Sequence, residues 1–155
     1  HAAGLPCVLH AGETEGPKSI WGALRVGKSQ RIGHGVRCLE DRELVDALRD
    51  RQIPLEICPT SNVCLGVSRS FAEHPLPHLL AEGLLLTLNS DDPPMFNTTL
   101  TQEFQHCVQA FGWGIEQLEQ LTHNAVNTAL LDEGERQALS ARVQAQMTTL
   151  KTQLS

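Results

Sequence analysis

Three short apolar runs in this sequence each end at side chains that can bind a metal ion or transfer a proton. Val8-Leu9 leads into His10-Ala11-Gly12-Glu13, Ile32 into Gly33-His34-Gly35, and Leu84–Leu88 into Asn89-Ser90-Asp91-Asp92. A strand buried on both faces reads as a short apolar run, and parallel α/β folds collect their reactive groups where such strands end. The pattern therefore predicts an enzyme site assembled from several strand ends.

His10 and Glu13 combine a metal-binding side chain with one that can transfer a proton. A neutral imidazole at a strand end can bind a divalent metal ion. Gly12 lets the backbone turn so that the carboxylate three residues after His10 faces the same cavity, where it is available for acid–base chemistry. The alternative is structural: His10 bonds a backbone group and Glu13 starts a solvated loop.

His34 lies between two glycines, which leave room for a ligand or a metal ion against its imidazole. An isolated histidine is more often a packed core residue. Flanking glycines at a strand end reverse that preference and favour a functional role for His34.

Asp91 and Asp92 are adjacent carboxylates at the mouth of a predicted buried strand. Because like charges repel, we expect one to bind a metal ion and the other to accept from a proton donor. A helix N-cap followed by Pro93 is the alternative. Histidine and aspartate ligands suit Zn²⁺ or a similar first-row ion, but a catalytic zinc usually has three protein ligands and only two are clear. His34 could be the third unless it serves as a base.

The elements that must position these residues alternate along the chain. We predict strands at Pro6–His10, Arg31–His34, Ile53–Cys58 and Leu84–Leu88, and helices at Lys18–Val26, after an Asp41 N-cap, and at Leu76–Ala81. A loop is predicted over Pro59–Pro77, and helices alone follow Pro94: Leu100–Phe111, Ile115–Leu130 and Glu133–Leu154. The strand-end residues His10, His34, Cys58 and Asp91 are spaced as repeated right-handed βα crossovers in one parallel sheet require.

Two architectures fit four βα units with C-terminal helices. One is a small doubly wound sheet, and the other is part of a (β/α)₈ barrel, which needs about 250 residues in all. The length of 155 residues favours the first. The opening His1-Ala2-Ala3-Gly4 is similar to the tail of a helix running into a strand and favours the second. Residues 1–155 are expected to form a single segment.

Composition argues against several classes of partner. Twelve basic and eighteen acidic residues give a net charge of −6, with no basic stripe for nucleic acid or an anionic membrane. The longest apolar stretch, Gly83–Leu88, is far short of the roughly 20 residues that span a bilayer, and we find no leader sequence. Five cysteines without a C-x-x-C pair favour reduced thiols. We therefore expect a cytoplasmic protein.

Four motifs in register resemble the C-terminal half of the adenosine deaminase family, including its adenine deaminase relatives. They are His10-Ala11-Gly12-Glu13, Arg31-Ile32-Gly33-His34-Gly35, Cys58-Pro59-Thr60-Ser61-Asn62 and Leu88-Asn89-Ser90-Asp91-Asp92-Pro93. The helical end, from Asn124-Ala125-Val126 to Arg136, is also similar to the closing segment of the family. The resemblance covers essentially all 155 residues.

The resemblance implies the C-terminal half of a TIM-type (β/α)₈ barrel and a zinc-dependent hydrolase that converts the 6-amino group of a purine to a 6-oxo group and ammonia. By motif, the zinc ligands would be His10 and Asp91. Glu13 would be the proton donor to purine N1, and His34 the base that orients and deprotonates the water on zinc. Asp92 would bind purine N7.

In that family the first strand supplies a His-x-His pair to zinc, and these residues contain none. The N-terminal half of the barrel, or another copy of the chain, would have to supply it. The isolated chain is therefore expected to be inactive, with too few metal ligands and an open sheet edge.

Three alternatives stay open at this stage. The substrate could be adenosine, adenine or an aminofutalosine-type nucleoside, and the stretch Asp91–Leu100 is similar to nucleoside-acting members. An amidohydrolase acting on another C–N bond would share the histidines and Asp91, but would lack an acid placed as Glu13. A non-enzymatic half-barrel kept as a binding module is the third.

Overall fold

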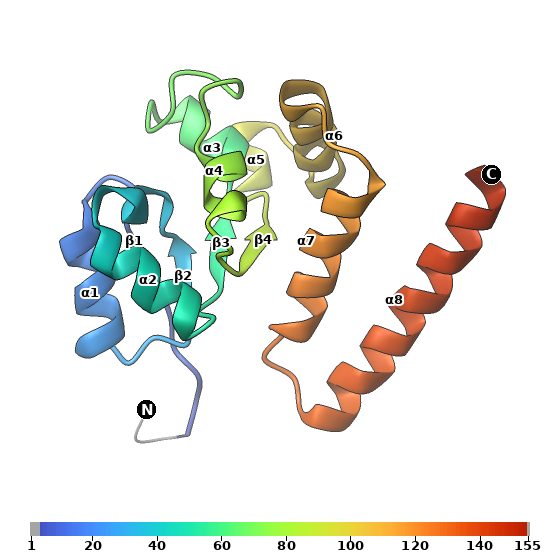
Figure 1. The fold of residues 1–155 in the computed structure, drawn as a ribbon, viewed down its shortest axis with the longest axis horizontal. Coiled ribbons are helices and arrows are strands. Elements are labelled where there is room, and N and C mark those ends of the chain that lie inside the picture. Colours follow the sequence, from blue (N-terminus) through green and yellow to red (C-terminus); the bar gives the residue numbers. More distant parts are fainter. Residues whose placement is uncertain (1–3, 155) are drawn as a thin grey trace.

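The fold is built on four parallel strands that pair in sequence order. The computed structural model describes residues 4–154; residues 1–3, where we expect the tail of a helix, lie outside the described residues. Strands β1 (Val8–Ala11), β2 (Arg31–His34), β3 (Leu55–Ile57) and β4 (Leu86–Leu88) form one sheet in the order β1-β2-β3-β4. Because all pairs are parallel, the strands end at the same edge of the sheet (Figure 1).

Helices follow the strands as the sequence predicts. Helix α1 (Pro17–Arg25) connects β1 to β2, while a 3₁₀ helix, η1 (Val36–Glu40), and α2 (Arg42–Asp50) connect β2 to β3. The predicted Asp41 N-cap is confirmed, since its side chain accepts a hydrogen bond from the Leu44 amide at 3.2 Å. Helix α4 (Leu76–Ala81) precedes β4. Four βα units of an α/β fold are therefore present.

The predicted loop over residues 59–77 is wrong at its start, where the structure has helix α3 (Pro59–Cys64). Pro59 occupies the first helical position, which needs no N–H partner. The next amide, that of Thr60, donates to Glu103 Oε2 at 3.0 Å. Glu103 is fully buried and lies in α6 (Leu100–Phe111). Because this partner comes from a distant helix, local sequence could not reveal it.

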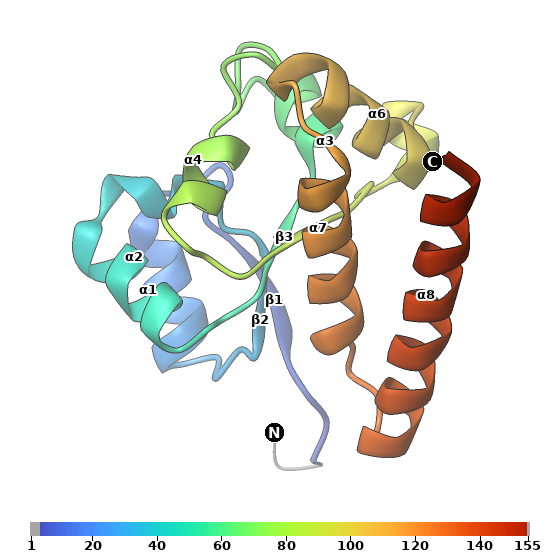
Figure 2. The same cartoon turned by 45° about the vertical axis from the view of Figure 1, so that its right-hand side comes forward.

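The C-terminal helices flank the sheet on the side of β4. After the short α5 (Pro93–Phe96) and α6, helix α7 (Ile115–Asn127) packs along β4 and α8 (Glu133–Leu154) packs beside α7 (Figure 2). Helix α7 ends three residues before its predicted end at Leu130. None of the helices within residues 4–154 combines the length and the apolar character that a bilayer crossing requires.

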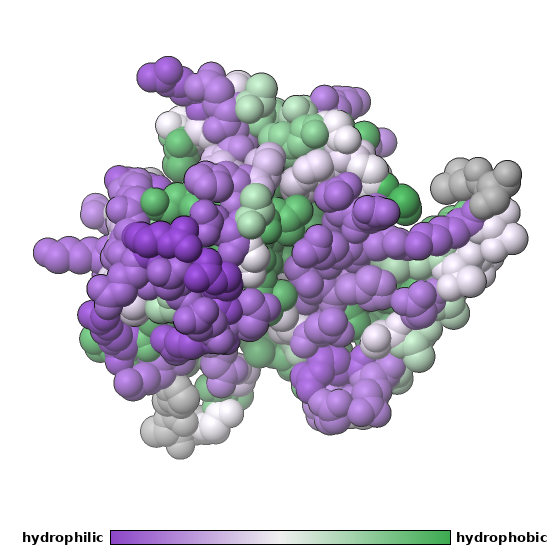
Figure 3. All heavy atoms as spheres, viewed as in Figure 1, coloured by the Kyte–Doolittle hydropathy of each residue, from purple (hydrophilic) through white to green (hydrophobic). Residues whose placement is uncertain are grey.

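The core lies between the sheet and α1, α2 and α4. Side chains with no measurable exposure come from both layers: Ile20, Ile32, Leu44, Leu48, Leu55, Ile57, Leu76, Leu79 and Leu86. Hydrophilic residues cover most of the outer face of α1 and α2 (Figure 3). The other face of the sheet is less covered: Val8 of β1 is exposed there and lines a cavity together with Glu56 of β3. The parallel sheet thus has one open face.

Candidate active site

Glu13 is the centre of a cluster at the carboxyl ends of β1 and β2. Its side chain is only 4% exposed. Oε2 lies 2.9 Å from His10 Nε2, while Oε1 accepts a hydrogen bond from Asn62 Nδ2 at 2.9 Å and lies 3.3 Å from His34 Nδ1. A buried carboxyl group is costly unless hydrogen bonds replace its lost water. These three contacts, from β1, β2 and α3, provide that replacement.

The backbone at the strand ends is shaped for this cluster. Gly12 has a φ of +70°, and a Cβ there would lie 2.3 Å from Ile20 Cδ1. The predicted turn between His10 and Glu13 therefore requires glycine. His34 and Asp91 adopt positive φ angles of 66° and 57°, which are uncommon for residues with a side chain. Such strain concentrates at functional sites.

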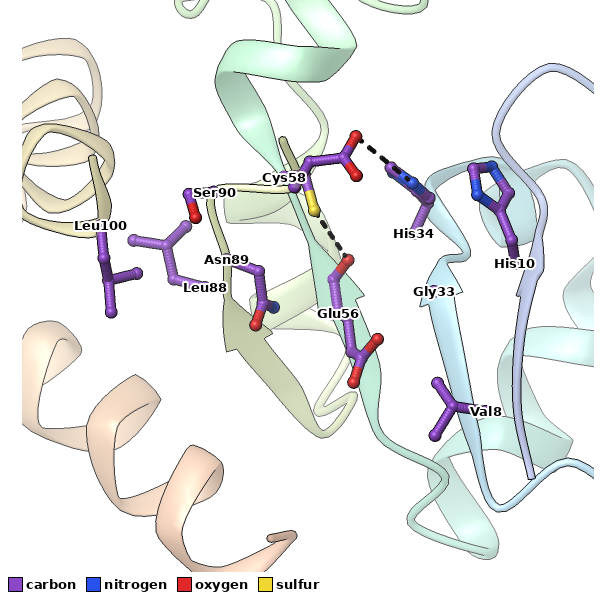
Figure 4. A pocket seen from close by; sticks show the side chains of 11 residues that line it. Val8, His10, Gly33, His34, Glu56, Cys58, Leu88, Asn89, Ser90 and Leu100 are labelled. Atoms are coloured by element: carbon purple, nitrogen blue, oxygen red, sulfur yellow. Dashed lines mark hydrogen bonds and ion pairs between the residues drawn. The ribbon is translucent and has the colours of Figure 1, made fainter. Parts of the chain in front are cut away.

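A cavity of about 500 Å³ opens at these strand ends. Its lining includes His10, His34, Glu56, Cys58 and Asp91, and all but Asp91 are labelled in Figure 4. A volume of this size falls within the range of about 300–1,000 Å³ typical of small-molecule sites. Polar groups from all four strand ends therefore meet at one cavity.

Two groups of metal-ligand atoms occur among residues 4–154, and they share His34. One contains His10, Glu13 and His34, the other His34, Cys58 and Asp91, with ligand atoms within 4.8 Å of one another. His34 Nε2 lies 3.8 Å from Asp91 Oδ2, and its ring centroid lies 4.2 Å from that of His10. The predicted ligands His10 and Asp91 thus each lie close to His34 but fall into different groups.

Burial controls the protonation of His34 and Cys58. Desolvation lowers the pKa of the His34 imidazole, and the nearby Glu13 carboxylate opposes this shift. A neutral ring can accept a proton, as a base must. Desolvation raises the pKa of the Cys58 thiol, and neighbouring carboxylates act in the same direction. Cys58 therefore stays a protonated thiol in this environment and is a poor nucleophile.

Asp92 lies outside the cavity lining. Its Oδ1 accepts a hydrogen bond from the Met95 amide at 3.0 Å, so it caps the N-terminus of α5, and the residue is exposed. This is the N-cap arrangement that the sequence left open as an alternative. The structure therefore brings His10, Glu13, His34 and Asp91 together but places Asp92 at the rim.

Two buried residues of the site, Asn62 and His74, were not predicted from the sequence to take part. In the structure, Asn62 donates to Glu13, and His74 Nε2 lies 3.2 Å from Asn62 Oδ1. The only sequence signal was the Asn62 position in a strand-end motif. Nothing local marks His74.

Comparisons of the sequence and the fold with known proteins point to one family. The family model described as adenosine deaminase matches residues 1–146. An adenine deaminase from Rhizobium johnstonii is 45% identical over 141 residues, which are 91% of this chain and 44% of that protein. The crystal structure of adenine deaminase from Arthrobacter aurescens has 35% identity and a TM-score of 0.91, over 95% of this chain and 45% of that one.

A more distant structure shows the same fold. The N6-methyl-AMP deaminase from Arabidopsis thaliana is 30% identical with a TM-score of 0.80, over 93% of this chain and 42% of that one. This chain therefore spans less than half the length of the relatives that it matches.

Proposed function

Because this chain belongs to the adenosine deaminase family, we propose that its strand ends form half of a site that hydrolyses the 6-amino group of a purine. One observation carries the proposal: a buried carboxyl group, Glu13, is held by His10, His34 and Asn62, and the two histidines line a cavity of about 500 Å³. A carboxyl group and an imidazole in one water-poor site can transfer protons in opposite directions.

The donor set at the cavity fits a zinc ion only in part. His10 Nε2 and the Asp91 carboxylate are nitrogen and oxygen donors of the kind that zinc accepts. We propose them as two of its ligands, with the remaining ligands supplied from outside these 155 residues. A bound zinc would supply a water nucleophile at neutral pH. Glu13 and His34 are kept out of the ligand set, because both are needed for proton transfer.

The proposed reaction adds one water molecule across the C6–N1 bond and then releases ammonia. Glu13 donates a proton to purine N1, which makes C6 electrophilic. His34 accepts the proton that the attacking water loses. His34 passes that proton to the 6-amino group, the bond between C6 and the amino nitrogen breaks, and ammonia leaves. The C6 hydroxyl proton returns to the Glu13 carboxylate, so the product carries a 6-oxo group. Asp92, at the rim, is proposed to donate a hydrogen bond to purine N7 from the O–H of its carboxylic acid form, since N7 can only accept.

The choice of purine is a finer part of the proposal. The stretch Asp91–Leu100 favours nucleoside-acting members of the family and hence adenosine. The curated relatives that are 43–45% identical are named adenine deaminases, which favours the free base. We propose that the protein acts on a 6-aminopurine, with adenine as the first substrate to test and adenosine as the second.

A chimera provides the direct test. In this chimera, the 155 residues would replace the matched segment of the Arthrobacter aurescens adenine deaminase. We call the chimera the completed barrel. We expect the completed barrel, purified with zinc, to release ammonia from adenine, from adenosine or from both. We expect the isolated chain, assayed with added zinc, to show no turnover.

Three results would count against the proposal. A folded, zinc-loaded completed barrel without activity on either purine would favour the non-enzymatic half-barrel. Activity confined to another C–N bond would favour a different amidohydrolase. Turnover by the isolated chain at enzyme-like rates would refute the need for a second half.

A further inference from the structure

Asn62 and His74 form a buried hydrogen-bonded chain behind Glu13. Asn62 is fully buried in α3, and His74, in the loop before α4, is 4% exposed. The Leu76 amide donates to His74 Nδ1 at 3.1 Å, His74 Nε2 lies 3.2 Å from Asn62 Oδ1, and Asn62 Nδ2 donates to Glu13 Oε1 at 2.9 Å. These three hydrogen bonds, which we call the Asn62–His74 relay, connect a backbone amide to the proposed proton donor.

The direction of each hydrogen bond in this chain is determined by its backbone end. An amide N–H can only donate, so His74 Nδ1 is the acceptor and the ring proton lies on Nε2. Burial lowers the pKa of His74 to about 4, which keeps the ring neutral at neutral pH. His74 Nε2–H therefore donates to Asn62 Oδ1. The NH₂ group of Asn62, Nδ2, must then face Glu13.

The reverse orientation of the Asn62 amide is unfavourable at both ends. It would place the amide oxygen against the Glu13 carboxyl oxygen and the NH₂ group against the Nε2–H of His74. Two acceptors would then face each other at Glu13 and two donors at His74, in a buried site. The contact of Asn62 Nδ2 with His34 Nδ1, at 3.4 Å, is longer than either of these bonds and does not offset both repulsions. His74 therefore holds Asn62 in one orientation.

We propose that Asn62, oriented by His74, holds the Glu13 carboxyl group through Oε1 and so determines which of its oxygens faces the substrate. This inference rests on the proposed function. The N–H of Asn62 occupies Oε1 at 2.9 Å, which leaves Oε2 as the oxygen for proton transfer. Asn62 and His74 are positioning residues, and His74 acts only through Asn62.

Substitutions in the completed barrel test this relay through kcat. A positioned general acid contributes roughly 10²–10⁴-fold to a rate, so we expect Asn62→Leu to lower kcat about 100-fold, with KM within about threefold and zinc content unchanged. His74→Leu should lower kcat about tenfold. His74→Gln keeps an N–H donor for Asn62 Oδ1 and should stay within about threefold of the wild type. His78→Gln, on the exposed face of α4, is the matched control.

A double variant, Asn62→Leu with His74→Leu, distinguishes a role in positioning Glu13 from a role in the stability of the fold. Because His74 acts through Asn62, adding His74→Leu to Asn62→Leu should cause no further loss of kcat. A purely structural role would lower the melting temperature but not kcat per zinc-loaded site. The relay is refuted if His74→Leu leaves kcat unchanged, if the two losses multiply, or if His74→Gln is as impaired as His74→Leu.

A spectroscopic measurement needs no activity. Two-bond ¹H–¹⁵N correlations of the histidine rings in the 155-residue chain should show His74 neutral at pH 7, protonated on Nε2 and accepting on Nδ1. A charged ring, or a proton on Nδ1, would refute the relay. A wild-type completed barrel without purine turnover would instead refute the proposed function.

Discussion

Acid should destabilise this fold through His74 in particular. Burial lowers the pKa of His74 from 6.5 to about 4. Between these values the unfolded chain binds a proton that the folded chain does not, so stability falls as the pH falls through this window. Above pH 6.5 the contribution is fully present. The gap between the two pKa values corresponds to roughly 3 kcal/mol in total, of which roughly 2 kcal/mol is lost by pH 5.

The assay is a pair of urea unfolding series at about pH 7.5 and about pH 5, on wild type and on His74→Gln. Other groups titrate in both proteins, so the difference between the two pH-dependent losses isolates His74. We expect the wild type to lose roughly 2 kcal/mol more than the variant. His78→Gln controls for removal of an exposed histidine. Equal losses in wild type and His74→Gln would refute the reasoning.

Three further substitutions, one of them with a control variant, test the site and the packing beneath it. Glu13→Gln in the completed barrel should lower kcat by about 10²–10⁴-fold with zinc still bound, and unchanged activity would remove Glu13 from the mechanism. Gly12→Ala should lower the free energy of unfolding in urea by more than the ~1–2 kcal/mol of a left-handed alanine, because its Cβ would meet Ile20 Cδ1 at 2.3 Å. Gly112→Ala, at a φ of +66° with nothing within 4 Å, is its matched control and should show the backbone cost alone; equal losses for the two variants would contradict the predicted clash. Leu48→Ala, at a fully buried position of α2, should cost roughly 2–5 kcal/mol in urea unfolding, and a loss below about 1 kcal/mol would contradict the assigned core.

Local sequence patterns predicted most of the fold. Four apolar runs and the intervening amphipathic helices set the α/β class and the parallel sheet, because buried strands and half-buried helices have different periodicities. The Asp41 cap was visible because an N-cap acts within one turn. Helix α3 was not visible, since its Thr60 amide is satisfied by Glu103, which lies in α6.

The candidate site, like the fold, was predicted from the sequence in part. The sequence by itself identified the chemical groups, His10, Glu13, His34 and Asp91, because each follows a strand and parallel strands end at one edge. Only the tertiary structure showed that Asp92 caps α5 at the rim and does not line the cavity.

The residues that hold Glu13 in place were also found only in the structure. Asn62 donates to that carboxyl group and is itself held by His74, in a loop that no pattern singled out. Strand periodicity is a local property that a sequence displays directly. A hydrogen bond between residues 49 positions apart depends on how α3 and its following loop fold back over the strand ends, and that is a property of the packed molecule.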